Sequence, residues 1–374
     1  PADELFANDH TCYWDTKGTQ YLPRNDHILT VPLPTPPTTA PMFASALSDN
    51  PSKVAEDTVY LRPSCKFCAC EDECIFDDPS PEVHWTIATW NINGLKSVSR
   101  KGQLLNFLIS QRPDVLCLTE VRCSIEDLNS IPGFMETLHL LGYHWQFWTP
   151  CTLPDCNNDS GFKSGYSGVA ILSRHPPTSV VTGVGDKDID AEGRVITASF
   201  RECTVICAYT PFSGEHFERL EFRKSFISGV SALVGRLRRH APSKRVILTG
   251  DFNVALRKED VYDGSFHKPG GTQYKPNCSP EERQPIMRLL TDHSLTDVYP
   301  TFKPNATNTH WTWFKTVKHR DKNIHGWRLD AFYADKDLLT ADQTSMRITD
   351  IYVDSHRYGS DHLPLLMKLA NVQA

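Results

Sequence analysis

The stretch Val246-Ile247-Leu248-Thr249-Gly250-Asp251-Phe252-Asn253-Val254 decides how the rest of the chain is read. Residues 246–249 form an apolar and β-branched run that is typical of a buried strand. Gly250 then breaks this run, and the spacing of Asp251 and Asn253 turns both side chains toward one side. A carboxylate accepts a proton and an amide donates hydrogen bonds, so the pattern predicts chemistry at a strand end. A simple turn capped by Asp or Asn is the alternative that this stretch alone leaves open.

The length and composition indicate one large α/β domain with an extension, or two average domains. The chain has 374 residues, of which 40% are hydrophobic, enough for a sizeable core. No apolar run approaches the roughly 20 residues of a membrane span. The sequence starts at Pro1 without the basic and apolar regions of a secretion signal, so we expect neither a membrane anchor nor secretion.

The negative charge is concentrated in residues 1–84. This segment carries 14 acidic against 5 basic residues, whereas residues 85–374 carry 31 against 34, so the net charge of −6 says little about what the larger part binds. The first 84 residues also contain Pro-rich runs without a sustained period. We interpret 1–84 as an acidic N-terminal extension that contains proline and cysteine, and 85–374 as the catalytic domain.

The cysteines indicate a reducing compartment. Three of the 12, Cys117, Cys203 and Cys207, lie inside apolar runs where a thiol behaves as a small core residue. A second group places four thiols within ten residues: Cys65, Cys68, Cys70 and Cys74. Their spacing leaves two interpretations open, a zinc site or a thiol-rich acidic linker.

The pattern of elements predicts two packed β-sheets covered by helices. Helical spacing is found at 103–111, 217–240 and 280–292. Short apolar runs predict strands at 86–91, 115–119, 169–173, 195–200, 204–209, 246–249, 311–314, 328–334, 346–353 and 364–369.

Polar residues of a useful kind follow several of these strands, and Asp330 lies inside an apolar strand where a charge needs a partner such as His362. The full set is Asn91, Asn93, Glu120, Tyr209, Asp251, Asn253, Asp330, Asp361 and His362. It combines ligands for a hard cation with acid/base groups. No positioned Ser or Cys nucleophile and no Gly-rich phosphate loop accompanies it. The set therefore favours attack of an activated water on a phosphodiester.

Seven short motifs in order resemble the exonuclease III class of apurinic/apyrimidinic endonucleases over about 83–370. They are WNING (90–94), TEVR (119–122), GYSGV (165–169), EGRV (192–195), GDFNV (250–254), WRLDAF (327–332) and SDHLP (360–364). The resemblance implies the four-layered α/β sandwich of the endonuclease/exonuclease/phosphatase superfamily. It also implies a nuclear or organellar, monomeric enzyme of base-excision repair. Such an enzyme cleaves 5′ to an abasic site in duplex DNA with Mg²⁺ or Mn²⁺, leaves a 3′-hydroxyl, and also processes blocked 3′ ends.

The resemblance further implies a role for each polar residue. Glu120 is the expected main metal ligand, with Asn91, Asp361 and Asn93 near it. Asn93 stands where the family often has Asp, which weakens a second metal site. Catalytic roles are implied for Asp251 on the water, for Asn253, His362 and Tyr209 on the phosphate, and for Asp330 as the residue that orients His362.

DNA contacts are expected from three places. Phosphate contacts are implied for Lys96, Arg100, Lys101, Tyr166 and the basic loop Lys315, Lys318, Arg320 and Lys322. A pocket for the baseless sugar is implied at Trp327, Leu329 and His310. Glu215 stands where the family often inserts Arg into the minor groove, so Phe212 or Phe217 is the candidate wedge. Solvated lysines and plain core packing are the alternatives.

Competing functions remain at this point. A tyrosyl-DNA phosphodiesterase and a retrotransposon-type endonuclease share the superfamily. A DNA-binding or redox module without catalysis is a different class of hypothesis, and it requires a broken ligand set.

Overall fold

The computed structural model describes residues 84–153, 165–306, 310–339 and 346–371. Nearer the N-terminus it also describes three short strands, β1 (Tyr13–Trp14), β2 (Gln20–Tyr21) and β3 (Val59–Leu61). β3 pairs with β6 (Trp145–Thr149) of the seven-stranded sheet. The four clustered cysteines, Cys65 to Cys74, lie outside the described residues.

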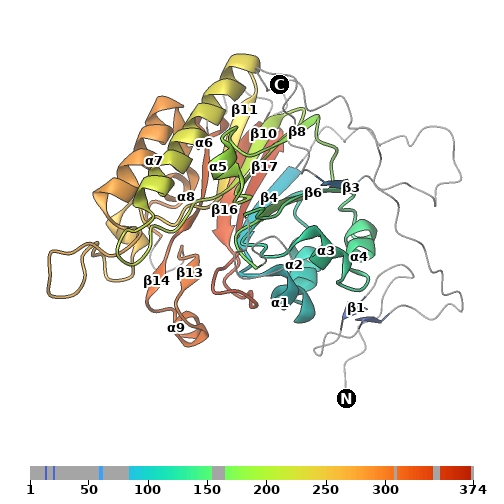
Figure 1. Ribbon diagram of the computed structural model, residues 1–374, viewed down its shortest axis with the longest axis horizontal. Helices are drawn as coiled ribbons and strands as arrows, with labels where there is room; N and C mark the ends of the chain where they lie inside the picture. The colour runs from blue at the N-terminus through green and yellow to red at the C-terminus, as the bar shows by residue number, and fades with distance from the viewer. Residues whose placement is uncertain are drawn as a thin grey trace, which may run out of the picture.

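Two mixed sheets form the body of the described molecule (Figure 1). The first has the order β16 (Met346–Val353), β17 (Leu365–Asn371), β4 (His84–Asn91), β5 (Val115–Thr119), β7 (Val169–Ser173), β6 (Trp145–Thr149) and β3. The second has the order β12 (Leu295–Asp297), β15 (Asp330–Asp335), β11 (Arg245–Asp251), β10 (Cys203–Tyr209), β9 (Val195–Ser199) and β8 (Ser179–Thr182).

The core between the sheets follows from the period-two alternation of the strands. On β4, Ile87 points into the layer between the sheets, while Trp90 belongs to the core on the outer face. On β11, Ile247 points between the sheets and Leu248 points outward. Both sheets thus bury both faces, which explains why their strands read as nearly continuous apolar runs.

Helices cover the two outer faces and complete four layers (Figure 1). The first sheet is covered by α1 (Leu95–Arg100), α2 (Gln103–Gln111), α3 (Ile125–Asn129) and α4 (Phe134–Leu140). The second is covered by α6 (Leu220–His240) and α7 (Pro280–Asp292). Shorter elements are α5 (Lys187–Asp190), α8 (Val298–Phe302), α9 (Val317–Asp321), β13 (Trp313–Phe314), β14 (Gly326–Trp327) and the 3-10 helices η2 (Lys258–Asp260) and η3 (Lys336–Leu339).

The sandwich confirms the predicted fold class, with one informative error. We expected Gly250 to end its strand, but β11 continues through Gly250 to Asp251. Gly250 has φ 138°, and a Cβ there would lie 1.9 Å from the carbonyl oxygen of Ala208 on β10. The glycine is therefore needed for close approach of two strands rather than for a turn. The sequence also missed the short strands β6 and β8.

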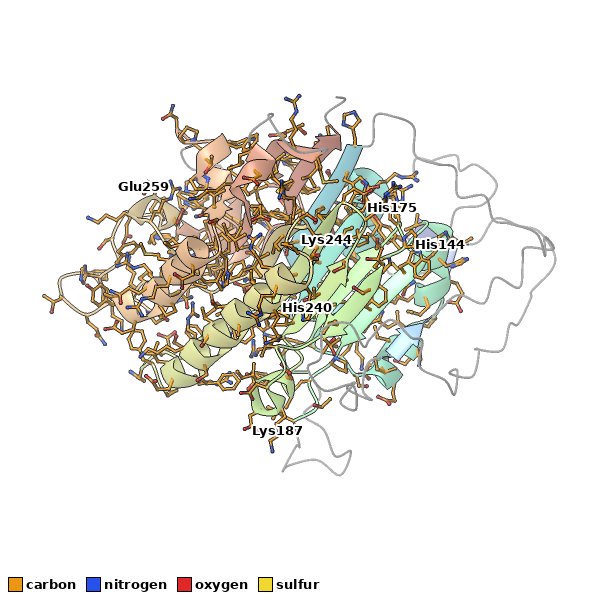
Figure 2. All side chains as sticks on the ribbon, turned by 90° about the horizontal axis from the view of Figure 1, so that it is seen from above. His144, His175, Lys187, His240, Lys244 and Glu259 are labelled. Atoms are coloured by element: carbon orange, nitrogen blue, oxygen red, sulfur yellow. The ribbon has the colours of Figure 1, made fainter. Side chains whose placement is uncertain are left out.

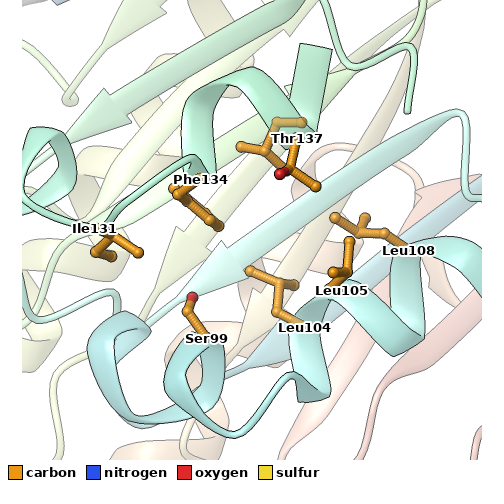
Figure 3. A pocket seen from close by; sticks show the side chains of 8 residues that line it. Ser99, Leu104, Leu105, Leu108, Ile131, Phe134 and Thr137 are labelled. Atoms are coloured by element: carbon orange, nitrogen blue, oxygen red, sulfur yellow. The ribbon is translucent and has the colours of Figure 1, made fainter. Parts of the chain in front are cut away.

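Figure 2 views the molecule from the end where His240, the last residue of α6, and Lys244, which precedes β11, lie. A small cavity of about 20 Å³ lies between α2 and α4 (Figure 3). Leu104, Leu108 and Phe134 line it, so it is a gap in apolar packing rather than a polar ligand site. No helix in the described ranges is both long and apolar enough to cross a membrane.

Candidate active site

The active-site residues lie where the inter-sheet core opens at the carboxyl ends of four strands. Asn91 shares its strand face with Ile87, and Asp251 shares its face with Ile247. β4 runs parallel to β5, and β10 runs parallel to β11, so the ends of each pair meet at one edge. The alternation that builds the core thus carries polar side chains from both sheets to one rim.

A buried chain of Asp330, His362 and Asp251 forms the first half of the site. The His362 ring donates from Nδ1 to Asp330 Oδ2 at 2.7 Å, the contact expected for a buried charge, although Asp330 is the first residue of β15 rather than an interior one. Its Nε2 lies 3.8 Å from Asp251 Oδ2. Burial alone would lower the pKa of His362, but Asp330 and Asp251 raise it to about 10. Burial raises the pKa of Asp251 to about 7, although His362 opposes this.

Glu120 is the centre of the second half. Its Oε1 accepts hydrogen bonds from Asn91 Nδ2 at 2.9 Å and from the Tyr209 hydroxyl at 2.7 Å. The same Asn91 amide also donates to Asp251 Oδ2 at 2.9 Å. Asn91 therefore joins the carboxylates of the two halves. Tyr209 stays a neutral donor, because burial and Glu120 raise the pKa of its hydroxyl.

Three site residues have left-handed backbone that is costly for side chains with a Cβ. Glu120 has φ 52°, Asn253 has φ 47° and Asn93 has φ 45°. The strain at Asn253 is offset locally, since its N–H donates to Asp251 Oδ1 at 2.8 Å and its Nδ2 donates to the carbonyl of Thr210 at 3.0 Å. The second Nδ2 hydrogen is available to a substrate oxygen.

Asp361 is held by N–H donors on both carboxylate oxygens. Asn93 Nδ2 donates to Oδ1 at 2.8 Å, and Trp313 Nε1 donates to Oδ2 at 3.0 Å. Burial would raise the pKa of Asp361, but His362 and these two donors keep it low. The backbone N–H of Asn93 also donates to Asn91 Oδ1 at 3.0 Å. The expected metal residues Asn91, Asn93 and Asp361 are thus brought together by direct hydrogen bonds.

Two buried arginines fix the loops that carry the site. Arg223 of α6 donates to the carbonyls of Pro211 and Phe252, each at 2.9 Å, and so joins the loops after β10 and β11. Arg194 donates to the carbonyl of Tyr209 at 3.0 Å and lies 4.5 Å from the centre of its ring. These contacts orient Tyr209 and Asn253 without touching the acid/base residues.

The expected DNA-contacting residues separate into exposed and buried sets. Arg100, Lys101 and Lys315 are exposed, and Lys96 is exposed but forms an ion pair with Asp127 at 2.5 Å. Arg320 is buried instead, which corrects its expected role, because its guanidinium donates to the carbonyls of Arg357 and Ser360.

The expected sugar pocket is also mostly buried. His310 is 3% exposed and Leu329 4%, whereas Trp327 is half-buried. His310 Nε2 donates to the carbonyl of Glu259 at 2.6 Å, and burial lowers the pKa of the ring. Two other expected contacts, Phe212 and Tyr166, are half-buried, and the Tyr166 hydroxyl accepts a hydrogen bond from Arg194 at 3.0 Å.

Several functional neighbours escaped the sequence analysis. Trp313 faces Trp327 at a ring-centre distance of 6.0 Å and orients Asp361. Arg122 forms an ion pair with Glu120. The burial of Arg223 could have been predicted from the sequence. It precedes Phe226 by three positions and Ile227 by four, so it lies on the apolar side of α6. Trp313 had none beyond its place in an aromatic run.

The donor set fits a hard divalent cation at Glu120. Glu120 Oε2 is buried and forms an ion pair with the Arg122 guanidinium, so a cation at this oxygen would displace that side chain. Carboxylate oxygen of this kind suits Mg²⁺ or Mn²⁺. Asp251, Asp330 and His362 also lie within 4.8 Å of one another, but a protonated His362 has no lone pair for a metal.

Comparison with known proteins assigns the chain to a family. It belongs to the endonuclease/exonuclease/phosphatase family, whose model matches residues 88–362. It is 30% identical to the DNA repair nuclease APEX1 of Danio rerio over 80% of this chain and 89% of the relative. It is 29% identical to an exodeoxyribonuclease of Bacillus subtilis over 75% and 97% of the two chains. The solved AP endonuclease of Leishmania major shares the fold, with a TM-score of 0.62 at 24% identity over 77% and 88% of the two chains.

Proposed function

We propose that the protein is an AP endonuclease of base-excision DNA repair, which hydrolyses the phosphodiester 5′ to an abasic site in duplex DNA and leaves a 3′-hydroxyl. The observation that carries this proposal is the buried Asp330–His362–Asp251 chain beside Glu120, at one rim of the sandwich. This rim holds a base, a cationic donor and a hard-cation ligand set, which together serve hydrolysis of a phosphodiester by water. Relatives that carry the names of a DNA repair nuclease and an exodeoxyribonuclease support it.

Asp251 is the proposed base for the attacking water. Its raised pKa brings the carboxylate close to the pH at which a base works best. The protonated His362 ring, oriented by Asp330, donates from Nε2 toward a phosphate oxygen as negative charge grows there. The free Nδ2 hydrogen of Asn253 supplies a further donor, whereas the Tyr209 hydroxyl uses its one hydrogen in the bond to Glu120 and so positions that carboxylate. Asp251, His362 and Asn253 are fixed before substrate arrives, so little reorganisation accompanies the reaction.

The proposed cofactor is one Mg²⁺, with Mn²⁺ as its substitute, held by Glu120 with Asn91 beside it. When bound, the cation polarises a phosphate oxygen and neutralises charge on the leaving group. Asp361 and Asn93 do not form a second metal site in this proposal. A pair of carboxylates needs a cation between them, whereas the Asn93 amide and the Trp313 indole already satisfy Asp361 with N–H donors.

The proposed substrates are duplex DNA with abasic sites and DNA with blocked 3′ ends, bound by a monomer through exposed Lys101, Arg100 and Lys315. Side activities of 3′-phosphodiesterase and 3′→5′ exonuclease are part of the proposal. The nucleus is its proposed location, because the DNA is there. The intact site argues against a module without catalysis.

The test compares rates on four DNAs of one sequence: a duplex with a tetrahydrofuran abasic analogue, the undamaged duplex, a 3′-blocked duplex and a tyrosyl-DNA adduct. We expect incision of the tetrahydrofuran duplex, slower removal of the 3′ block, and no reaction elsewhere. Cutting of the undamaged duplex at the same rate would refute the proposed specificity for abasic sites. Fast release of tyrosine would favour the tyrosyl-DNA alternative.

A further inference from the structure

A groove of about 490 Å³ runs from the active site between α1 and α9. Ser97, Lys101 and Gln103 form one wall, and the segment 314–317 forms the other. The loop 358–361 lies at its base, and Asn93 and Asp361 form its end at the active site. Figure 1 shows α1 and α9 on the two sides of the loop that precedes β17. The groove is therefore continuous with the rim where the bond is cut.

The charge of this groove suits an anion. Lys101 and Lys315 are exposed along it, and the buried Arg320 guanidinium lies behind its base. Asp361 is the one carboxylate among its lining residues in the described chain, and N–H donors occupy both of its oxygens. Because hydrogen-bond donors already occupy Asp361, the two exposed lysines dominate the charge of the groove. Such a surface attracts the phosphates of a nucleic-acid backbone.

The same groove also contains an exposed aromatic ring, that of Tyr358, which would bind a flat apolar group rather than a phosphate. Tyr358 is 50% exposed and Val317 is 54% exposed, although both are large apolar side chains beside a polar site. The ring of Tyr358 rests on the Arg320 guanidinium at 4.1 Å, and its hydroxyl donates to Asp321 at 3.3 Å. The guanidinium thus covers one face of the Tyr358 ring and holds the ring in place. Stacking of a ligand ring on the other face then costs little further side-chain entropy.

The position of this loop is also fixed by packing. Gly359 has φ 117°, and a Cβ there would lie 2.9 Å from the side chains of Gln103 and Val98. The loop that carries Tyr358 therefore lies directly against α1 and α2. A paired base has no face available to such a ring, because both of its faces are stacked within the duplex. An unpaired base offers a free face, and aromatic rings between cations are the usual means of binding single strands.

We infer that the groove binds unpaired nucleotides of the DNA strand that leaves the active site, with a base on Tyr358 and phosphates on Lys101 and Lys315. This inference rests on the proposed function, because it takes the strand to be that of the incised substrate. It adds a substrate class: abasic sites and 3′ ends that border a single-stranded segment are preferred over the same lesions in fully paired DNA.

The experiment compares three tetrahydrofuran substrates, one fully paired and two with a short unpaired segment directly 5′ or 3′ of the lesion. We expect a KM roughly tenfold lower for one of the two partly unpaired substrates, the usual worth of stacking one base. Tyr358→Ala and Val317→Glu should abolish this preference and leave kcat on the paired duplex unchanged. Tyr358→Phe should keep the preference, because the ring remains.

Lys244→Glu is the control for a change of charge, since Lys244 lies beyond the opposite end of β11 (Figure 2). Binding of an undamaged single-stranded oligonucleotide, measured by fluorescence anisotropy, tests the groove without incision, and Tyr358→Ala should weaken it roughly tenfold. Equal KM values for all three substrates, or an unchanged affinity of Tyr358→Ala for the oligonucleotide, would overturn the inference and leave the proposed function intact. Failure to cut any of the three substrates, with normal oligonucleotide binding, would instead overturn the proposed function.

Discussion

At the residue scale, three carboxylates of one rim differ by what each side chain contacts. Asp251 shares its surroundings with a cationic His362 and has a raised pKa. Glu120 accepts hydrogen bonds from Asn91 and Tyr209 on one oxygen and forms an ion pair with the exposed Arg122 through the other. Asp361 accepts N–H donors on both oxygens. The same side-chain chemistry therefore supports a base, a metal ligand and a structural acceptor.

Asp251→Asn removes the proposed base and keeps the shape of the side chain. We expect kcat to fall by roughly 10²- to 10⁴-fold, the usual contribution of a general base. DNA affinity should change little, because Asp251 is buried and its contacts are internal. Single-turnover rates and equilibrium binding on the tetrahydrofuran duplex separate the two effects. A variant that cuts at the wild-type rate would show that another group activates the water.

The pH dependence of wild-type activity follows from the pKa of Asp251, which burial raises to about 7. A base acts in its deprotonated form, so kcat/KM should rise with pH below this value and level off above it. The His362 donor acts in its protonated form, and its pKa of about 10 places the loss of activity on the alkaline side. Initial rates at constant ionic strength and saturating Mg²⁺ give the profile. A flat profile from about pH 5 to pH 8 would contradict the assignment.

Asn93→Asp tests the proposal of a single metal ion. The change places a carboxylate against Asp361, where an amide donor now lies 2.8 Å from Oδ1. We expect binding of Mn²⁺ without DNA to change from one ion to two, because two adjacent carboxylates favour a cation between them. Electron paramagnetic resonance of free Mn²⁺ measures the stoichiometry. Asn93→Ala is the matched control and should still bind one ion; two ions in the wild type would refute the proposal.

At the element scale, β11 delivers both Asp251 and the loop that carries Asn253. It lies between β10 and β15, and its register places Tyr209 and Asp330 on either side of Asp251. The three side chains therefore reach the rim because β10 and β11 end, and the antiparallel β15 begins, at the same edge. Any change in the spacing of β10 and β11 displaces all of them.

Gly250→Ala should disturb this register. The new Cβ would lie 1.9 Å from the carbonyl oxygen of Ala208, a contact that only movement of the backbone relieves. We expect the free energy of unfolding to fall by about 3 kcal/mol or more, in the upper range for one substitution. Gly264→Ala is the matched control, with φ 62° and no atom within 4 Å of its Cβ, and should cost about 1 to 2 kcal/mol. Urea unfolding measures both; equal losses would show that backbone conformation, not the close approach, determines the cost.

Much of this element structure was predictable because buried strands carry continuous apolar runs. The predicted ranges for β5, β7, β16 and α7 agree with the structure, and the motif residues meet at one rim. Contacts that depend on tertiary packing were not predictable. Trp313 and Asp361 are 48 positions apart, and nothing local links them. The burial of Arg320 likewise follows from carbonyls that only the folded loop 357–360 presents.

At the scale of the whole molecule, the site joins two sheets that otherwise meet through apolar packing. Asn91 and Glu120 come from the first sheet, and Tyr209, Asp251 and Asp330 come from the second. Asn91 donates across this boundary to Asp251, and Tyr209 donates back across it to Glu120. The geometry of the site thus exists only when both sheets are packed together.

Metal binding should therefore stabilise the whole sandwich. A cation that binds the folded but not the unfolded chain raises the free energy of unfolding by about 2.7 kcal/mol at 100 times its Kd. We expect Mg²⁺ to raise the Tm of the wild type relative to NaCl of equal ionic strength. Glu120→Gln should abolish this increase, because the amide keeps the shape but loses the charge that holds the cation. Asp361→Asn should retain most of it, since Asp361 is committed to Asn93 and Trp313. If Asp361→Asn instead removed the increase and Glu120→Gln kept it, the cation would belong beside Asp361, and the hydrogen bonds there would have to give way to it.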